Sequence, residues 1–148
     1  MKIAFVTDRF PAVSNTFVTN QITGLLDLGH DVHIHAVNAG DFRTAHGVER
    51  EYGLERRMHH LPIPRNRLRR AAVAAGHLLR PASWNPSTAG ALDFRRLGAD
   101  ALSLSALYTN LSLQRSGPYD VIHCQFAKLG PVALPAALHA RTPLVVAA

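Results

Sequence analysis

The sequence predicts a doubly wound α/β fold, in which helices cover both faces of a parallel sheet. Residues 2–7 form a short segment rich in branched and aromatic side chains, which is typical of a strand buried on both faces. Residues 16–28 then carry apolar side chains at helical spacing, and residues 31–37 return to a strand pattern. A buried strand, a helix and a second strand in this order form the opening unit of such a sheet.

The connection between the first strand and the first helix, residues 8–15, is the first place to expect function. Pro11 cannot donate a backbone hydrogen bond and biases Phe10 away from helical angles, while Ser14 or Asn15 can cap the helix. Ligands of doubly wound sheets bind outside the carboxyl ends of the strands, near helix amino termini. Since the connection contains no glycine and neither glycine-rich phosphate motif, a dehydrogenase or a P-loop NTPase is disfavoured.

The second strand, residues 31–37, places His33 and His35 on one face. Two imidazoles on a strand can bind zinc, but no third ligand follows at metal spacing. We therefore expect exposed strand histidines and no metal site.

The next elements are shorter. Residues 38–53 are polar and rich in turn formers, with a helical turn at 48–52, and residues 57–64 resemble a short strand that two prolines end. A helix is expected from Arg67. Its apolar face would comprise Leu68, Ala71, Ala72, Ala75, Leu78 and Leu79.

The second half of the chain completes the alternation. After a break at residues 81–90, the pattern predicts one long helix over 93–114, a strand within 119–126, a helix over 130–140 and a strand within 142–148. This order predicts a Rossmann-like parallel sheet of about five strands. We expect residues 1–148 to form one domain, since this length suits one core.

Composition excludes several classes of protein. Apolar residues make up 47% and charged residues 18% of the chain, which favours a packed globular domain over disorder. The single cysteine, Cys124, permits no internal disulfide framework, and no apolar stretch is long enough to span a bilayer. A cytoplasmic location is the default expectation.

The net charge of +6 is unevenly spread along the chain. Residues 56–81 contain several arginines and no acidic residue. Arg65, Arg67, Arg69 and Arg70 are the candidates for an anionic partner surface. They could meet an anionic membrane, a phosphorylated substrate or nucleic acid, or form a solvated face only. Nucleic acid is the least favoured partner, because no aromatic side chains are interleaved with these arginines.

Two blocks carry a resemblance to a known family. Residues 2–36 read KIAFVTDRFPAVSNTFVTNQITGLLDLGHDVHIHA, and residues 119–126 read YDVIHCQF, followed by a helix and TPLVV. The first block resembles the start of family 4 glycosyltransferases of the GT-B fold, which have an F-P-x-x-S-E-T-F loop and a G-H-[DE]-V turn. The second is similar to the D-[VI]-[IV]-H-x-H-[FW] strand of that family.

The resemblance implies one half of a GT-B fold, the acceptor-binding amino-terminal domain of a retaining glycosyltransferase of the hexosyltransferase type. Such enzymes use a nucleotide-sugar as co-substrate, bound mainly by a carboxyl-terminal domain, and need no other cofactor. The acceptor could be a saccharide, a lipid-linked or a small molecule. The family's next motif would begin where Ala148 ends, so we expect a truncated chain that is inactive alone, with no catalytic residue of its own.

The resemblance also indicates binding residues for the acceptor or donor cleft: Phe10, Ser14, Asn15, Thr16, His123, Gln125 and Phe126. Asn15 replaces the glutamate of the family motif, and Gln125 replaces its second histidine, which keeps hydrogen bonding but loses protonation near neutral pH. Helix capping, a satisfied buried histidine and core packing of the phenylalanines remain the structural alternatives.

Two other classes of function stay open. The chain could be a basic binding module for anionic lipid or nucleic acid without catalysis, and binding to an anionic membrane could also accompany a transferase. It could equally be a domain that keeps the sheet without activity. Because the last strand would have a free edge, we also expect the chain to self-associate.

Overall fold

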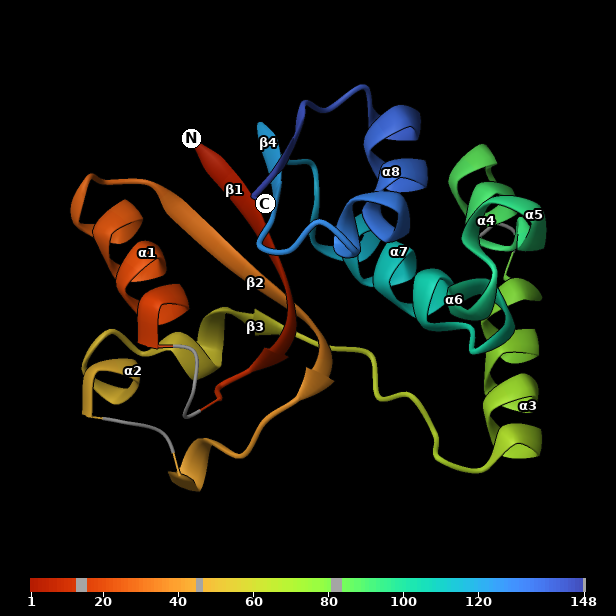
Figure 1. Cartoon of the computed structure of the whole chain (residues 1–148), viewed down its shortest axis with the longest axis horizontal. Coiled ribbons are helices and arrows are strands. Elements are labelled where there is room, and N and C mark those ends of the chain that lie inside the picture. Colours follow the sequence, from red (N-terminus) through yellow and green to blue (C-terminus); the bar gives the residue numbers. More distant parts are fainter. Residues whose placement is uncertain (13–15, 45–46, 81–83, 148) are drawn as a thin grey trace.

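The computed structural model describes residues 1–12, 16–44, 47–80 and 84–147. Within them a parallel sheet has the order β3-β2-β1-β4-β5 (Figure 1). The strands are β1 (Lys2–Phe10), β2 (Asp31–Ala39), β3 (Met58–His59), β4 (Val121–Cys124) and β5 (Leu144–Val146). This arrangement confirms the predicted Rossmann-like fold class.

β1 occupies the centre of the sheet and pairs on both sides. Ile3 lies opposite Val32 of β2 and Val121 of β4. The strand continues beyond its predicted end at Thr7, because its backbone stays paired with β2 as far as Phe10.

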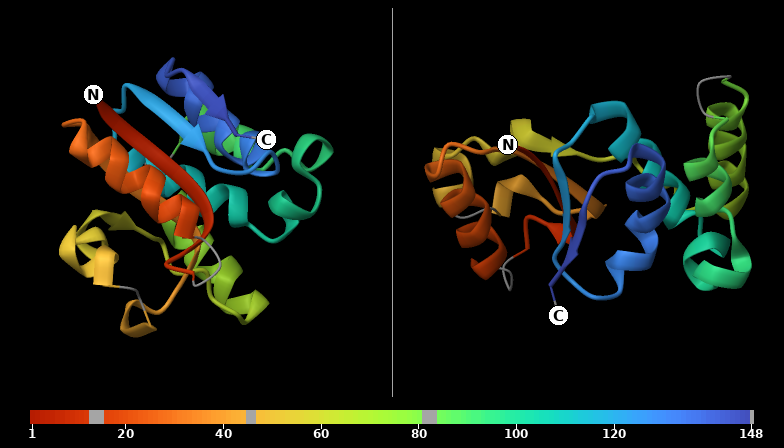
Figure 2. Two further views of the ribbon diagram at one scale, coloured as in Figure 1. Left: turned by 60° about the vertical axis from the view of Figure 1, so that its left-hand side comes forward. Right: turned by 90° about the horizontal axis from the view of Figure 1, so that it is seen from above.

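Helices cover both faces of the sheet (Figure 2). α1 (Thr16–Asp27), as predicted from the spacing, lies on one face with α2 (Gly47–Glu51) and the 3-10 turns Phe42–Thr44 and Leu54–Arg57. α7 (Ser105–Ser116) and α8 (Leu129–Ala140) lie on the other face. The core under α1 comprises Phe5, Phe10, Val18, Ile22, Val32, Ile34, Ala36 and Leu54.

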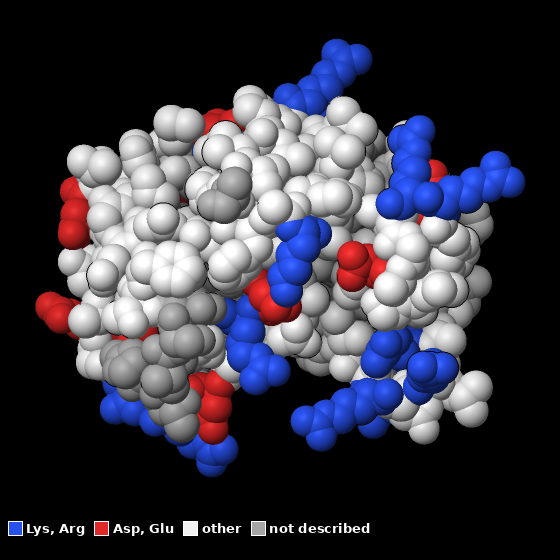
Figure 3. Space-filling view, viewed as in Figure 1, with Lys and Arg blue, Asp and Glu red and all other residues white. Residues whose placement is uncertain are grey.

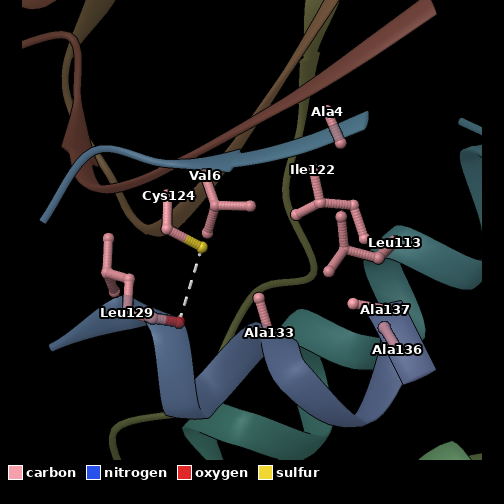
Figure 4. Close-up of a cluster of buried hydrophobic side chains, with 9 residues drawn as sticks. All are labelled: Ala4, Val6, Leu113, Ile122, Cys124, Leu129, Ala133, Ala136 and Ala137. Atoms are coloured by element: carbon pink, nitrogen blue, oxygen red, sulfur yellow. Dashed lines mark hydrogen bonds between the residues drawn. The ribbon is translucent and has the colours of Figure 1, made fainter. Parts of the chain in front are cut away.

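The core under α8 is built from small side chains (Figure 4). Ala133, Ala136 and Ala137 of α8 allow the helix to approach the sheet closely. Cys124 is fully buried there, its thiol lies 3.6 Å from the carbonyl oxygen of Leu129, and burial raises the pKa of Cys124 to about 12. A thiol in this environment stays protonated, as expected of an inert core cysteine.

An outer helical layer packs on α7. It comprises α3 (Arg67–Leu78), α4 (Pro86–Ala91), α5 (Phe94–Leu97) and α6 (Ala99–Leu102). The expectation of one helix over 93–114 is therefore wrong. The backbone turns at Gly98 (φ +50°) and at Leu104 (φ +61°), and this left-handed region interrupts a right-handed helix.

The apolar face predicted for α3 is mostly exposed to solvent rather than packed against the core. Leu68 is 82% exposed and Leu79 is 80% exposed, and the alanines of that face are exposed as well. Of the predicted face, Leu78 does pack on α7, together with Val73 and Ala74, which were not predicted to do so. α3 thus has apolar side chains on both sides.

His35 is buried rather than exposed as predicted, with 1% of its surface accessible. Its ring nitrogens share hydrogen bonds with Ser112 of α7 (2.9 Å) and with Tyr119 (2.8 Å), while His33 Nδ1 lies 2.7 Å from His59 Nε2. No group of three or more metal-ligating side chains occurs among the described residues. The strand histidines therefore form a packed polar network between β2 and α7.

Lowering the pH should destabilise this fold through His35. Burial, followed by the nearby His59 and His33, lowers the pKa of His35 from 6.5 to about 3. The native state therefore keeps the ring neutral, whereas the unfolded chain takes up a proton below pH 6.5. The free energy of unfolding should be highest above pH 6.5 and fall by about 2 kcal/mol between pH 7.5 and pH 5. Urea unfolding at both pH values measures this, and an equally steep fall in a His35→Gln variant would contradict it.

Candidate functional site

The strand order reverses between β1 and β4. From β1 the chain proceeds to β2 and β3 on one side, and β4 and β5 lie on the other. The connections that leave the carboxyl ends of β1 and β4 therefore diverge to opposite faces. A crevice at such a switch point is where open α/β sheets bind their ligands.

Two contacts bring these connections together. Asp8, near the end of β1, forms an ion pair with Lys128, which lies just before α8. The distance from Lys128 Nζ to Asp8 Oδ2 is 2.6 Å. Phe17 at the start of α1 meets Phe126 edge to face, with ring centroids 6.4 Å apart. Exposed Thr16 precedes Phe17, so the beginning of α1 lies beside the segment that follows β4. The candidate residues Ser14 and Asn15 lie outside the described residues.

The connection after β1 is also fixed against β2. Pro11 is buried, and the amide of Gly40 donates to the carbonyl of Phe10 at 2.8 Å. A Cβ atom at position 40 would overlap the carbonyl of Pro11, so only glycine fits there. The described part of this connection is thus held at the carboxyl edge of the sheet.

Three buried polar atoms near this edge have no hydrogen-bond partner in the described parts of the chain: Thr7 Oγ1, His123 Nε2 and Gln125 Oε1. Strand alternation places all three side chains on the face of Phe5, the face that α1 covers. A buried polar atom without a partner costs about 1–3 kcal/mol. Such atoms are ready to bind a hydroxyl or amide group.

His123 and Gln125, predicted as binding residues from the resemblance, lie on the same face of the sheet. The His123 ring stacks on Phe5, with centroids 4.8 Å apart. Gln125 is 6% exposed, and its backbone amide donates to the carbonyl of Val6 at 2.9 Å, which extends the pairing of β4 with β1. Thr7 was missed, because an isolated threonine in a buried strand gives no functional signal in the sequence.

The two candidate phenylalanines differ. Phe10 is fully buried in the core and contacts Phe42, so it cannot stack on a sugar ring as the sequence allowed. Phe126 is half-buried and packs partly against the core under α8. Of these two candidates, Phe126 is therefore the one whose ring a ligand could touch.

The four candidate arginines do not form one surface. Arg65 and Arg70 line a cavity between the sheet edge and the outer helical layer, which they share with Arg9 and His60. Arg69 lines a second, more apolar cavity with Pro62 and His77. Arg67 is exposed at the start of α3.

No helix within the described ranges is long and apolar enough to cross a membrane.

Comparisons with known proteins agree with the resemblance. The chain is 35% identical over 142 residues to the protein of Salmonella typhimurium assigned by name as colanic acid biosynthesis glycosyltransferase WcaL, covering 93% of this chain and 33% of that relative. It is 36% identical over 106 residues to the amylovoran biosynthesis glycosyltransferase AmsK of Erwinia amylovora, covering 70% of this chain and 26% of AmsK. The chain therefore spans about a quarter to a third of the length of these relatives.

No solved structure matches the chain significantly. A family model described as "Glycosyl transferase 4-like domain" matches residues 14–148. This match covers most of the chain and contains the second motif block and the part of the first block from residue 14 onward. The chain belongs to the glycosyl transferase 4-like domain family.

Proposed function

We propose that this chain is the acceptor-side part of a retaining glycosyltransferase that takes a sugar from a nucleotide-sugar donor. The observation that carries the proposal is the group of unpartnered buried atoms on Thr7, His123 and Gln125 at the switch point between β1 and β4. A sugar acceptor presents hydroxyl groups that both donate and accept hydrogen bonds. These side chains offer a hydroxyl, an imidazole nitrogen and an amide oxygen to such groups.

The first turn of α1 adds a second kind of contact. The amino terminus of this helix has backbone N–H groups and a partial positive charge, which suit a hydroxyl or a phosphate oxygen. The contact between Phe17 and Phe126 keeps this terminus beside the segment after β4. In this proposal Thr16 contacts the ligand from the α1 side, and Ser14 and Asn15 stay predicted binding residues.

The names of the relatives support a saccharide as acceptor. They place those proteins in colanic acid and amylovoran biosynthesis. Because the chain spans about a quarter to a third of their length, we place the donor-binding domain, and the catalytic groups that act on the donor, in a part of the full-length protein outside residues 1–148. The nucleotide-sugar is then a co-substrate, and the acceptor contacts belong to this chain.

A His123→Phe substitution distinguishes a role of His123 in acceptor binding from a role in folding. The aromatic ring can still stack on Phe5, while the buried nitrogen disappears. In the full-length protein, the transfer rate should fall by about tenfold to a hundredfold, because the acceptor loses a hydrogen bond. The free energy of unfolding should stay equal or rise by about 1 kcal/mol, since an unpartnered polar atom is removed.

Sugar transfer and urea unfolding measure the two effects. A His139→Phe variant at the exposed end of α8 is the matched control, and it should keep full turnover. Full turnover in His123→Phe would remove His123 from the cleft. If the full-length protein transfers no sugar from any nucleotide-sugar donor, the proposed activity is contradicted.

A second candidate function, attachment to an anionic membrane surface, rests on α3 and the segment after it. Leu68 and Leu79 of this region are more than three-quarters exposed, and so is Trp84, at 76%. Exposed Arg67 and Arg69 lie beside Leu68. Apolar side chains with flanking arginines are typical of helices that lie in the headgroup region of a bilayer.

Vesicle binding tests this attachment. The full-length protein should sediment with vesicles that contain anionic lipid, and high salt should weaken the binding. A Leu68→Ser/Leu79→Ser double variant should bind at least about tenfold more weakly, since about 0.8 kcal/mol is lost for each CH₂ group no longer buried. Leu102→Ser on α6 changes a similarly exposed leucine and should have no effect. Equal loss in both variants, or salt-sensitive binding to RNA instead of vesicles, would contradict the proposal.

A further inference from the structure

A polar cavity of about 560 Å³ opens beside the switch point, between the carboxyl ends of β1 and β2 and the outer helical layer. The side chains that matter for its chemistry are Asp8, Arg9, His60, Arg65, Arg70 and Asp100. In Figure 3, basic side chains gather over the lower end of α3 and, across a notch in the outline, near the ends of β1 and β2. The cavity thus has cationic groups on two opposing walls.

Its three arginines come from β1, from the segment before α3 and from α3 itself. Neither Arg9 nor Arg65 takes part in an ion pair with any described residue. Arg70 donates from Nε to the carbonyl of Pro64 at 2.8 Å and from Nη1 to the carbonyl of Ser103 at 3.0 Å. Carbonyl oxygens orient this guanidinium without neutralising it.

The acidic residues of the cavity do not balance these charges. The Asp8 carboxylate is paired with Lys128 at 2.6 Å and also accepts from the Asn38 amide at 3.2 Å. Asp100 accepts a hydrogen bond from Ser105 at 3.3 Å and is the remaining carboxylate on the wall. Three guanidinium groups therefore face one carboxylate without a cationic partner.

His60 lines the same cavity, and a hydrogen bond fixes the orientation of its ring. Its Nδ1 lies 3.0 Å from the carbonyl oxygen of Ala36. Because a carbonyl can only accept, Nδ1 carries the hydrogen and Nε2 has no partner among the residues described. The ring is thereby held at the cavity wall with Nε2 available to a ligand.

We propose that this cavity binds a phosphate or diphosphate group of the acceptor. The inference rests on the proposed transferase function and adds to it the class of substrate, a phosphorylated saccharide acceptor. Guanidinium groups bind phosphate oxygens through paired N–H donors, and the cavity has the size of a small-molecule site. Asp8 borders both the cavity and the switch point, so one acceptor can place its phosphate among the arginines and its reacting sugar near His123.

Inorganic pyrophosphate is the probe, and isothermal titration of the full-length protein is the measurement. An Arg9→Gln/Arg65→Gln variant should bind pyrophosphate at least tenfold more weakly. An Arg67→Gln/Arg69→Gln variant removes the same charge outside the cavity and should weaken binding less than threefold. Equal weakening in both variants, or no binding of pyrophosphate to the unmodified protein, would overturn the proposal.

Two further titrations identify the source and the class of the anion. Uridine and guanosine diphosphates should bind the Arg9→Gln/Arg65→Gln variant as well as the unmodified protein. If they lose affinity as pyrophosphate does, the cavity serves the donor, and the acceptor assignment is overturned. Glucuronate bound as tightly as pyrophosphate would overturn the choice of phosphate.

These titrations need no turnover, so the two proposals can fail separately. A protein without transferase activity that still binds pyrophosphate through Arg9 and Arg65 contradicts the proposed function and keeps the anion site. An active transferase whose cavity variant binds pyrophosphate normally contradicts the anion site alone.

Discussion

The structure depends on one central strand whose two edges and two faces are all occupied. β1 pairs with β2 along its length and with β4 along its first half, while alternate side chains enter separate cores under α1 and α8. A one-residue slip would exchange those cores, because strand side chains alternate between faces. The same pairing fixes the relative height of Asp8, Thr7 and the end of β4. The position of the switch point is therefore a consequence of the sheet register rather than of the loops.

Much of the fold follows from periodicity in the sequence. The helices α1 and α8 and the strands β1 and β2 each keep one pattern along their length, so their type and order are predictable. The stretch from 93 to 116 is different, because its apolar residues continue at helical spacing through Gly98 and Leu104. A leucine gives no sign in the sequence that it adopts a left-handed conformation, and tertiary packing decides the break.

The orientation of α3 and the make-up of the candidate site show a second limit of sequence analysis. A helix with apolar residues on two sides has no unique inner face, so the choice between Leu68 and Ala74 depends on what α7 presents. His123 and Gln125 were indicated by the resemblance of residues 119–126 to a family motif. Thr7, and the pairing of Asp8 with a lysine far along the chain, required the strand register and the path of the chain after β4.

The outer helical layer occupies the long connection from β3, at one edge of the sheet, to α7 and β4. Among the described residues this layer supplies no strand, and the sheet order is complete without it. Its sequence can therefore change without disturbing the register of β1. Descendants of such a chain could exchange one surface chemistry for another, while the carboxyl edge of the sheet stays intact.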